Sequence, residues 1–288
     1  MLICPDCKSP IEFLRSCLGC GWSLNYIENI PVYLGDKKSI LIENYIKCYE
    51  RISLDDLQET ILPKKYIKYQ AQKLIRHLPS FKDIKICDLG VGQGILAKSI
   101  RQQGFMDVAV VDIAVPYLKL LKDDFRAIVA DAENLPFQEE FDCIFSTDVM
   151  EHVINIGSFL FSVNKALKKN GIFIFRVPDL ENLMQYKPHM GCKYDFVHLR
   201  SFNSELIKDL MKNAGFSIKK LEYDGYWAYS YKNFVTKNKI FNFLYSKLYP
   251  KITKDNFIFA DNYLKKFFCF LFLKPLKIVC VARKIEDL

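Results

Sequence analysis

Four cysteines near the start of the chain have the spacing of a metal site. "CPDC" and "CLGC" form a CxxC-x9-CxxC array from Cys4, Cys7, Cys17 and Cys20. Each pair places two thiolates on one tight turn, and two such turns can close a tetrahedron around Zn2+. Four sulfur ligands leave no open coordination position. The array therefore predicts a structural zinc site, with no catalytic role for the metal.

A second set of residues could hold a ligand by its backbone. "KICDLGVGQG" ends an apolar run in Asp88, and Gly90, Gly92 and Gly94 follow. Glycines let the backbone approach a ligand closely and leave amide groups pointing at it. Nucleotide phosphates, dinucleotides and S-adenosylmethionine (SAM) are all bound by such loops. The spacing here is G-x-G-x-G, whereas dinucleotide sites usually have G-x-G-x-x-G.

Three more acids follow later apolar runs, and they favour SAM among these ligands. Asp112, Asp131 and Asp148 each stand at the end of a predicted strand, and such ends meet at one edge of a parallel sheet. Asp112 is placed to accept both hydroxyls of a ribose. Asp131, followed by Ala132, suits the amino group of an adenine. Four carboxylates repel a pyrophosphate, but they suit a sulfonium cation.

Candidate catalytic residues follow the fourth predicted strand. Asp148, Glu151 and His152 form D-x-x-E-H, and His198 opens "HLRSF". A histidine has a near-neutral pKa, which suits removal of a proton from an acceptor hydroxyl. The alternative interpretation is structural: His152 caps a helix, and His198 fixes a loop through Arg200.

The elements that must position these residues alternate between strands and helices. Residues 43–78 have helical apolar spacing, and "YIENIPVYL" before them is interpreted as one strand. Beyond residue 84, strands in "IKICDLG", "DVAVVDI", "AIVADAENLPF", "FDCIFST" and "GIFIFRVPD" alternate with helices, two of which are predicted over residues 117–125 and 159–169. This order predicts an α/β fold with a doubly wound, mostly parallel sheet.

The whole series resembles the class I SAM-dependent methyltransferases, specifically the type-11-like group that acts on small molecules and glycans. The resemblance is carried by "DLGVGQG", "VVDI", "DAENLPF", "FDCIFSTDVMEHV", "LKKNGIFIFRVP" and "HLRSFNSELIKDLMKNAGF", with a last strand near residues 277–283. It implies a seven-stranded Rossmann-like sheet. The SAM-binding positions that it implies are Asp88, Gly90, Gly92, Gly94, Asp112, Asp131 and Ala132. The first 35 residues look like the zinc-ribbon modules that are attached to, or are partners of, many methyltransferases.

A second resemblance leaves the mechanism open. D-x-x-E-H is similar to the E-x-x-E-H of ubiquinone-pathway O-methyltransferases and small-RNA 2′-O-methyltransferases, which binds a divalent metal. This chain departs at the first position, where Asp148 is one methylene shorter than Glu. Two mechanisms therefore stand side by side: a general base at His152 or His198, and a second divalent metal at Asp148, Glu151 and His152.

Composition limits the class of protein and isolates one unusual segment. The chain has 288 residues, half of them hydrophobic, and shows neither a spanning apolar run nor a signal peptide, so we expect cytoplasmic residence. Residues 226–288 hold eleven lysines and one arginine against four acids, a balance of +8. This balance equals the net charge of the whole chain, so the rest of the chain is neutral overall. Sixteen aromatic residues lie between positions 226 and 272. This segment could be a helical cap, a peripheral contact with the inner face of the membrane, or a nucleic-acid surface.

The sequence thus predicts four parts: a zinc ribbon (1–36), a helical linker or lid (37–80), a class I core (81–225 and 276–288), and a basic aromatic helical insertion (226–275). The predicted function is transfer of a methyl group from SAM to a hydroxyl of a sugar, a lipid-linked glycan or another small metabolite. The alternatives are RNA methylation, against which stand the few arginines of the insertion and the lack of a separate RNA-binding fold, and a non-catalytic SAM-binding scaffold.

Overall fold

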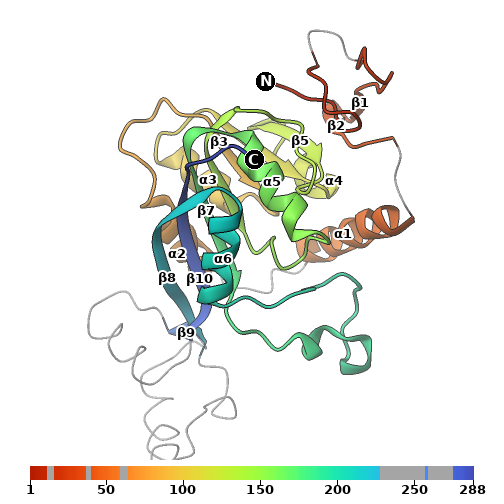
Figure 1. The fold of residues 1–288 in the computed structure, drawn as a ribbon. Helices are drawn as coiled ribbons and strands as arrows, with labels where there is room; N and C mark the ends of the chain where they lie inside the picture. Colours follow the sequence, from red (N-terminus) through yellow and green to blue (C-terminus); the bar gives the residue numbers. More distant parts are fainter. Residues whose placement is uncertain (12–15, 37–39, 59–63, 228–256, 259–274) are drawn as a thin grey trace, which may run out of the picture.

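The fold is built on one large twisted sheet with helices on both faces (Figure 1). It was obtained as a computed structural model, in which residues 1–11, 16–36, 40–58, 64–227, 257–258 and 275–288 are described. The strands are β1 (Asn25–Ile27), β2 (Ile30–Tyr33), β3 (Ile86–Leu89), β4 (Val108–Asp112), β5 (Arg126–Ala130), β6 (Phe141–Thr147), β7 (Leu167–Pro178), β8 (Phe216–Trp227), β9 (Phe257–Ile258) and β10 (Pro275–Lys284). The helices are α1 (Ile40–Gln58), α2 (Lys64–Ile75), α3 (Ile95–Gln102), α4 (Val115–Lys119), α5 (Ile156–Ala166) and α6 (Ser204–Asn213), with short 3-10 turns η1 (Leu183–Tyr186) and η2 (Pro188–Met190).

The sheet confirms the predicted doubly wound topology. Its order is β1-β2-β5-β4-β3-β6-β7-β10-β8-β9, and the strands from β2 to β7 run parallel. The seven expected strands are β5, β4, β3, β6, β7, β10 and β8, with β10 antiparallel to both of its neighbours. The sheet order changes direction beside β3, between β4 and β6. At such a switch point two loops diverge and leave a crevice at the carboxyl ends of the strands.

Buried side chains form one apolar layer on each face of the sheet. α2, α3 and α4 cover one face, where Leu74, Ile100 and Leu118 are buried, and α5 and α6 cover the other with Phe159 and Met211. The central strands read as continuous apolar runs because both of their faces are covered. No helix in the described residues is both long and apolar enough to cross a membrane.

The N-terminal part extends this sheet, which the sequence did not predict. The segment interpreted as one strand is a hairpin, because Glu28 and Asn29 have positive φ values of 49° and 67° and form a tight turn between β1 and β2. β2 then pairs in parallel with β5, so that Val32 stands opposite Val129 and Tyr33 opposite Ala130. Backbone pairing at the sheet edge therefore joins the cysteine-rich segment to the core.

Other predicted boundaries shift by a few residues. The helix expected over residues 117–125 ends at Lys119, and the one expected over 159–169 runs from Ile156 to Ala166. Within the predicted insertion, β9 pairs with the end of β8, so a short strand lies where only helix was expected. The rest of that prediction, including its lysines and most of its aromatic residues, falls on 228–256 and 259–274, outside the described residues.

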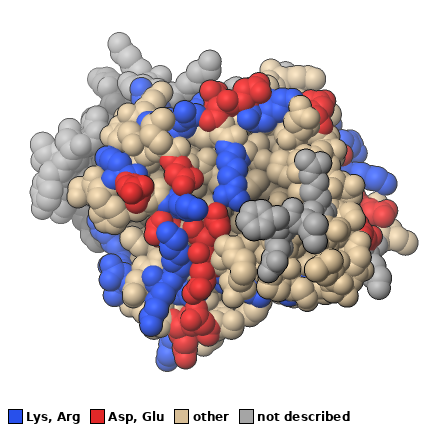
Figure 2. Space-filling model, turned by 90° about the horizontal axis from the view of Figure 1, so that it is seen from above, with Lys and Arg blue, Asp and Glu red and all other residues tan. Residues whose placement is uncertain are grey.

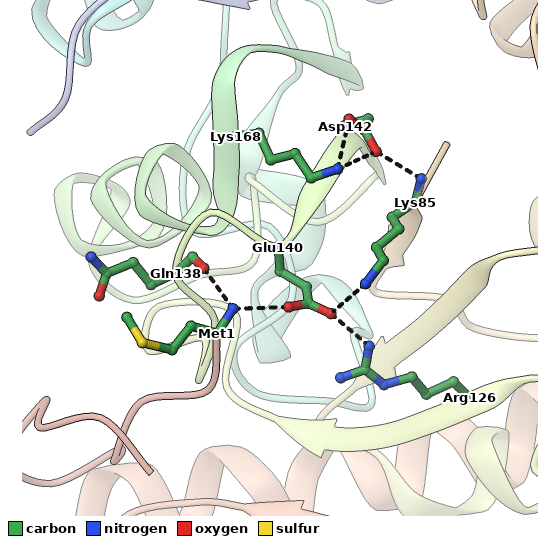
Figure 3. Close-up of polar contacts among 7 residues, drawn as sticks. All are labelled: Met1, Lys85, Arg126, Gln138, Glu140, Asp142 and Lys168. Atoms are coloured by element: carbon green, nitrogen blue, oxygen red, sulfur yellow. Dashed lines mark hydrogen bonds and ion pairs between the residues drawn. The ribbon is translucent and has the colours of Figure 1, made fainter. Parts of the chain in front are cut away.

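A charged network closes the amino end of the sheet, opposite the expected ligand edge (Figure 3). The Glu140 carboxylate lies 3.0 Å from the Met1 amine, 3.0 Å from Arg126 Nη1 and 3.6 Å from Lys85 Nζ. The Asp142 carboxylate accepts from Lys168 Nζ at 2.8 Å and from the Lys85 amide at 2.9 Å. The two acids therefore tie the starts of β3, β5 and β6 together.

We expect Glu140→Gln to lower the free energy of unfolding at pH 7 by about 1 kcal/mol. Burial alone raises the pKa of Glu140, but the Met1 amine and Arg126 outweigh it and lower the pKa to about 2. A depressed carboxyl pKa stabilises the fold above the ordinary value near 4.5, and this stability is lost as the pH falls towards 2. Urea unfolding at pH 7 and pH 3 should therefore show a difference that shrinks with acid. Glu139→Gln, at an exposed neighbour, should change neither value.

Candidate functional site

A cavity of about 330 Å3 opens at the carboxyl ends of β3, β4, β5 and β6. Its wall includes the following predicted residues: Gly90, Gly92, Asp112, Asp131, Ala132, Asp148 and His152. Tyrosines from three other parts of the chain complete it: Tyr45, Tyr49, Tyr117 and Tyr194. The structure thus brings most of the predicted ligand residues to one place, at the switch point of the sheet.

Asp112 fixes the glycine loop at the floor of this cavity. Its Oδ2 accepts a hydrogen bond from the Gly92 amide at 3.1 Å, and its Oδ1 accepts from the Ala114 amide at 2.9 Å. Gly92 has φ +51°, and a Cβ there would meet no protein atom within 4 Å, so its open side faces the cavity. Burial raises the pKa of Asp112 to about 6, although the two amides act against this shift. The carboxylate keeps further lone pairs for a ligand hydroxyl.

Asp88, Gly90 and Gly94 shape the loop from beneath. Asp88 is buried below the cavity wall, its Oδ2 has no partner in the described residues, and burial raises its pKa to about 7. A Cβ on Gly90 would lie 2.3 Å from Val149 Cγ2, and one on Gly94 would lie 2.5 Å from Leu121 Cδ2. Gly90 therefore serves close packing as well as the cavity wall, whereas Gly94 packs away from the cavity before α3.

Helix α1 spans the cavity and connects its two sides. On one side, Asp56 Oδ2 accepts from Tyr117 Oη at 2.9 Å and from Gln93 Nε2 at 3.1 Å, next to the glycine loop. On the other side, Tyr49 Oη donates to the Phe196 carbonyl at 2.9 Å and Cys48 Sγ donates to the Asp195 carbonyl at 2.9 Å. Helix α1, which lies in the segment predicted as a linker or lid, is thus hydrogen-bonded to both the glycine loop and the segment before His198.

Asp148 of the D-x-x-E-H pattern lies outside the group of potential metal ligands that Glu151, His152 and His198 form in the described residues. Asp148 Oδ2 accepts from Arg176 Nε at 3.1 Å, and its Oδ1 accepts from Lys277 Nζ at 2.8 Å. Burial raises the pKa of Asp148, but these two cations outweigh it and hold the pKa well below its usual range. Both carboxylate oxygens are therefore engaged by cations, one from β7, the next strand, and one from β10, near the other end of the chain.

His198 takes the place that the sequence assigned to Asp148. Glu151, His152 and His198 each offer a ligand atom, and these atoms lie within 4.8 Å of one another. The rings of His152 and His198 meet edge to face, with centroids 4.6 Å apart. Both Glu151 carboxylate oxygens and His152 Nδ1 are buried without a partner in the described residues. Burial raises the pKa of Glu151 to about 8 and lowers that of His152 to about 3.

Sequence reasoning missed Glu181, which holds His198. Its Oε2 is hydrogen-bonded to His198 Nδ1, and its Oε1 accepts from Tyr186 Oη. The Tyr186 ring stacks on His198 with centroids 4.1 Å apart. The acid directly after the fifth core strand, in "RVPDLE", is Asp179, so the pattern of the other four acids points to Asp179 and gives no signal for Glu181. Arg200 contacts the backbone of Met150, Val153 and Ile154 and does not fix His198 directly.

The four cysteines of the N-terminal part also converge. Cys4 Sγ lies 3.6 Å from Cys20 Sγ, and Cys7 Sγ lies 3.4 Å from Cys17 Sγ. All four sulfur atoms lie within 4.8 Å of one another. Tetrahedral zinc with Zn–S bonds of about 2.3 Å would separate its sulfur atoms by about 3.8 Å, so the cluster has the size of such a site.

The sheet topology and the cavity at its switch point define a class I SAM-dependent methyltransferase domain. Residues 64–221, more than half of the chain, match the methyltransferase domain family, and the chain belongs to that family. SAM is the cofactor of this class.

Individual relatives agree with this family. A ubiquinone biosynthesis O-methyltransferase of Pelagibacter ubique is 30% identical over 162 residues, which cover 49% of this chain and 65% of the relative. One of Rickettsia bellii is 27% identical over 114 residues, covering 38% of this chain and 48% of the relative, so the chain spans about half the length of that relative. A SAM-dependent methyltransferase of Thermotoga maritima shares the fold, with a TM-score of 0.56, 17% identity, and coverage of 83% and 99%.

Proposed function

We propose that the protein transfers the methyl group of SAM to a hydroxyl oxygen of a small molecule. The observation that carries this proposal is the shared cavity: the glycine loop and the acids expected to bind SAM line one part of it, and His152 lines another, with His198 directly behind. The relatives of Rickettsia bellii and Pelagibacter ubique are named as O-methyltransferases, which supports an oxygen acceptor. Their names give no support to a sugar or glycan, and four tyrosines line the wall, so we restrict the acceptor to a small metabolite.

The reaction makes one bond and breaks one bond at the methyl carbon. The acceptor oxygen attacks the methyl group in line with the departing sulfur, and S-adenosylhomocysteine leaves as a neutral thioether. The enzyme mainly holds the two reactants close and aligned. The acceptor hydroxyl must also lose its proton, and a positioned histidine is suited to accept it.

We propose that His198 is this base and that Glu181 is a positioning residue behind it. Because Glu181 Oε2 faces His198 Nδ1, the neutral ring carries its proton on Nδ1 and keeps a lone pair on Nε2. The Tyr186 hydroxyl holds the other Glu181 oxygen, and its ring fixes the plane of His198. A buried His152 with a strongly lowered pKa stays neutral and packs between Tyr49 and His198.

A divalent metal ion fits the same residues. Glu151, His152 and His198 would hold it, because the first two present buried oxygen and nitrogen atoms that lack a partner in the described residues. A bound divalent ion would polarise the acceptor hydroxyl. Glu181 would then orient His198 as a ligand, as carboxylates commonly do for metal-binding histidines. The contacts of Asp148 with Arg176 and Lys277 argue against including it in this set.

We also propose that Cys4, Cys7, Cys17 and Cys20 bind a structural zinc ion. Two of the cysteines are buried in the same apolar cluster as Leu135 and Phe137 of the core, so the metal would stabilise the attachment of the N-terminal part. Acidic and basic side chains intermix over the described surface shown in Figure 2, which favours neither RNA nor another polyanion as a partner there. Contact with the membrane surface stays a prediction, because most of residues 226–275 lie outside the described residues.

Radiolabelled methyl transfer from SAM tests the proposal directly. Purified protein would be incubated with phenols and other small alcohols, sugars, total RNA and no acceptor in parallel, with and without added Mg2+ or Mn2+. We expect label in a small hydroxyl compound only. Label in RNA would support the RNA alternative, and SAM binding without turnover on any acceptor would support the scaffold alternative.

A further inference from the structure

The N-terminal part contacts the cofactor cavity through the segment 131–138, which follows β5. The Ile3 amide donates to the Pro136 carbonyl at 3.0 Å, and the Gln138 amide donates to the Met1 carbonyl at 2.9 Å. Leu2 pairs with Phe137 as an antiparallel bridge between these two bonds. The first three residues therefore lie along the far end of the segment as an additional short strand.

A tighter contact lies at Asn134, in the middle of the segment. Asn134 Nδ2 donates to the Pro5 carbonyl at 2.9 Å, and Lys8 Nζ donates to the same carbonyl at 3.1 Å and also to Asn134 Oδ1. Pro5 lies between Cys4 and Cys7, within the first cysteine turn. The Lys8 amide donates to the Cys4 carbonyl at 3.0 Å, so the cysteine turn also orients Lys8.

Asn134 belongs to the turn that aims Asp131 into the cavity. The Asn134 amide donates to the Asp131 carbonyl at 2.9 Å, and the Glu133 amide donates to Asp131 Oδ1 at 2.9 Å. Asp131 and Ala132 line the cofactor cavity. A shift of Asn134 would therefore move the acid that is expected to bind the adenine.

The strand before Asp131 is held from the same N-terminal part. β2 places Tyr33 opposite Ala130, the last residue of β5. The buried Trp22 stacks on Tyr33 with centroids 5.9 Å apart and donates to the Leu34 carbonyl at 2.9 Å. Trp22 follows the second cysteine turn, and its carbonyl accepts from the Cys17 amide at 2.6 Å. Both cysteine turns therefore support the two sides of Asp131.

We propose that the cysteine-rich part is a working component of the cofactor site, in which Lys8 and Asn134 are positioning residues that act through Asp131 and depend on metal at the four cysteines. This inference rests on the proposed zinc and cofactor sites. Four thiolates at these separations repel one another unless a cation neutralises them. Without the metal the first turn would open, and the Pro5 carbonyl and Lys8 would leave Asn134.

The effect should be partial, because other contacts also hold the segment. Glu133 accepts from the Ile154 and Asn155 amides, and the Leu135 amide donates to Ser162 Oγ. Coupling energies between sites usually change an affinity by between about fivefold and 150-fold. We therefore expect a change of about tenfold in cofactor affinity, with a folded core.

The test is the affinity of the full chain for S-adenosylhomocysteine, measured by calorimetry in zinc-loaded and chelated protein. Lys8→Met keeps the apolar stem and removes the ammonium, and Lys98→Met, on the exposed face of α3, is the matched control. We expect Lys8→Met and chelation each to weaken binding about tenfold. In chelated protein Lys8→Met should add little, because the contact is already lost, and Lys98→Met should have no effect in either state.

Two outcomes would overturn the inference. Unchanged affinity in zinc-loaded Lys8→Met, with thermal unfolding like that of the wild type, would show that the contact of Lys8 with Asn134 does not support cofactor binding. Equal additional losses in loaded and chelated protein would show that Lys8 acts independently of the metal. Failure of the cofactor assignment itself would look different, since zinc-loaded wild type would then not bind S-adenosylhomocysteine at all.

Discussion

Asp112→Ala is expected to weaken SAM binding by about 100-fold, the largest change in cofactor affinity that we predict. The variant loses a charged acceptor for two ribose hydroxyls, and a hydrogen bond to a charged group contributes about 1.5–3 kcal/mol. It also releases the Gly92 and Ala114 amides, which are 3.1 and 2.9 Å from the carboxylate. The glycine loop would therefore lose its anchor as well as its ligand contact. Calorimetric titration with SAM measures the change.

The control for this experiment lies at the opposite end of the same strand. Asp107→Ala removes an exposed carboxylate just before β4, at the end of the strand away from the cavity, and should leave the affinity unchanged. Equal SAM affinity in Asp112→Ala and wild type would refute the proposed cofactor site. In that case the glycine loop would have to serve another ligand.

The pH dependence of binding follows from the same residue. Burial raises the pKa of Asp112 to about 6, and only the ionised form is a strong acceptor for two hydroxyls. Affinity for SAM should therefore rise as the pH increases from 5 to 7, since the carboxylate loses its proton over this range. Asp112→Asn cannot ionise, so its weaker binding should lack this component of the pH dependence. A profile that is the same in both proteins would argue against Asp112 as the group that titrates.

His198→Ala is expected to lower kcat between about 100-fold and 10,000-fold, while SAM binds as in the wild type. His198 is part of both mechanisms: it is the base in one and a metal ligand in the other. It does not line the SAM cavity directly, so cofactor affinity should be preserved. His189→Ala, on an exposed histidine of the same loop region, is the matched control and should retain full activity. Initial rates at saturating SAM, with the acceptor found by the screen, measure this effect.

Two further variants separate the mechanisms. Glu151→Gln keeps the shape of a buried side chain but weakens a metal ligand, so in the metal mechanism it should abolish activation by Mg2+ or Mn2+ and lower kcat about as much as His198→Ala. In the metal-free mechanism it should have little effect. Glu181→Gln should lower kcat about tenfold in either case and shift the pH profile, because His198 loses the charge that orients its ring. If the pH profile of Glu181→Gln is the same as that of the wild type, Glu181 has only a structural role.

The sequence by itself determined the class of the protein and most residues at the floor of the cavity that we propose binds SAM. Strands and helices alternate with clear periodicity, and the carboxyl ends of parallel strands share one edge, so the order of the residues alone was enough to place Asp112, Asp131 and the glycine loop together. The cysteine spacing is equally local, since each CxxC turn positions its own two sulfur atoms. In both cases short-range geometry is sufficient for the prediction.

Only the tertiary structure decided the partners that come from distant parts of the chain. Asp148 matches a metal-binding pattern in sequence, but Arg176 from β7 and Lys277 from β10 engage both of its oxygens. Glu181 and His198 lie in the irregular segment between β7 and α6. Its sequence has no helical or strand periodicity, so the contact between the two residues was not predictable. The pairing of β2 with β5 was also not predictable from the sequence. A strand edge can pair with any backbone of suitable geometry, and backbone hydrogen bonds do not require particular side chains.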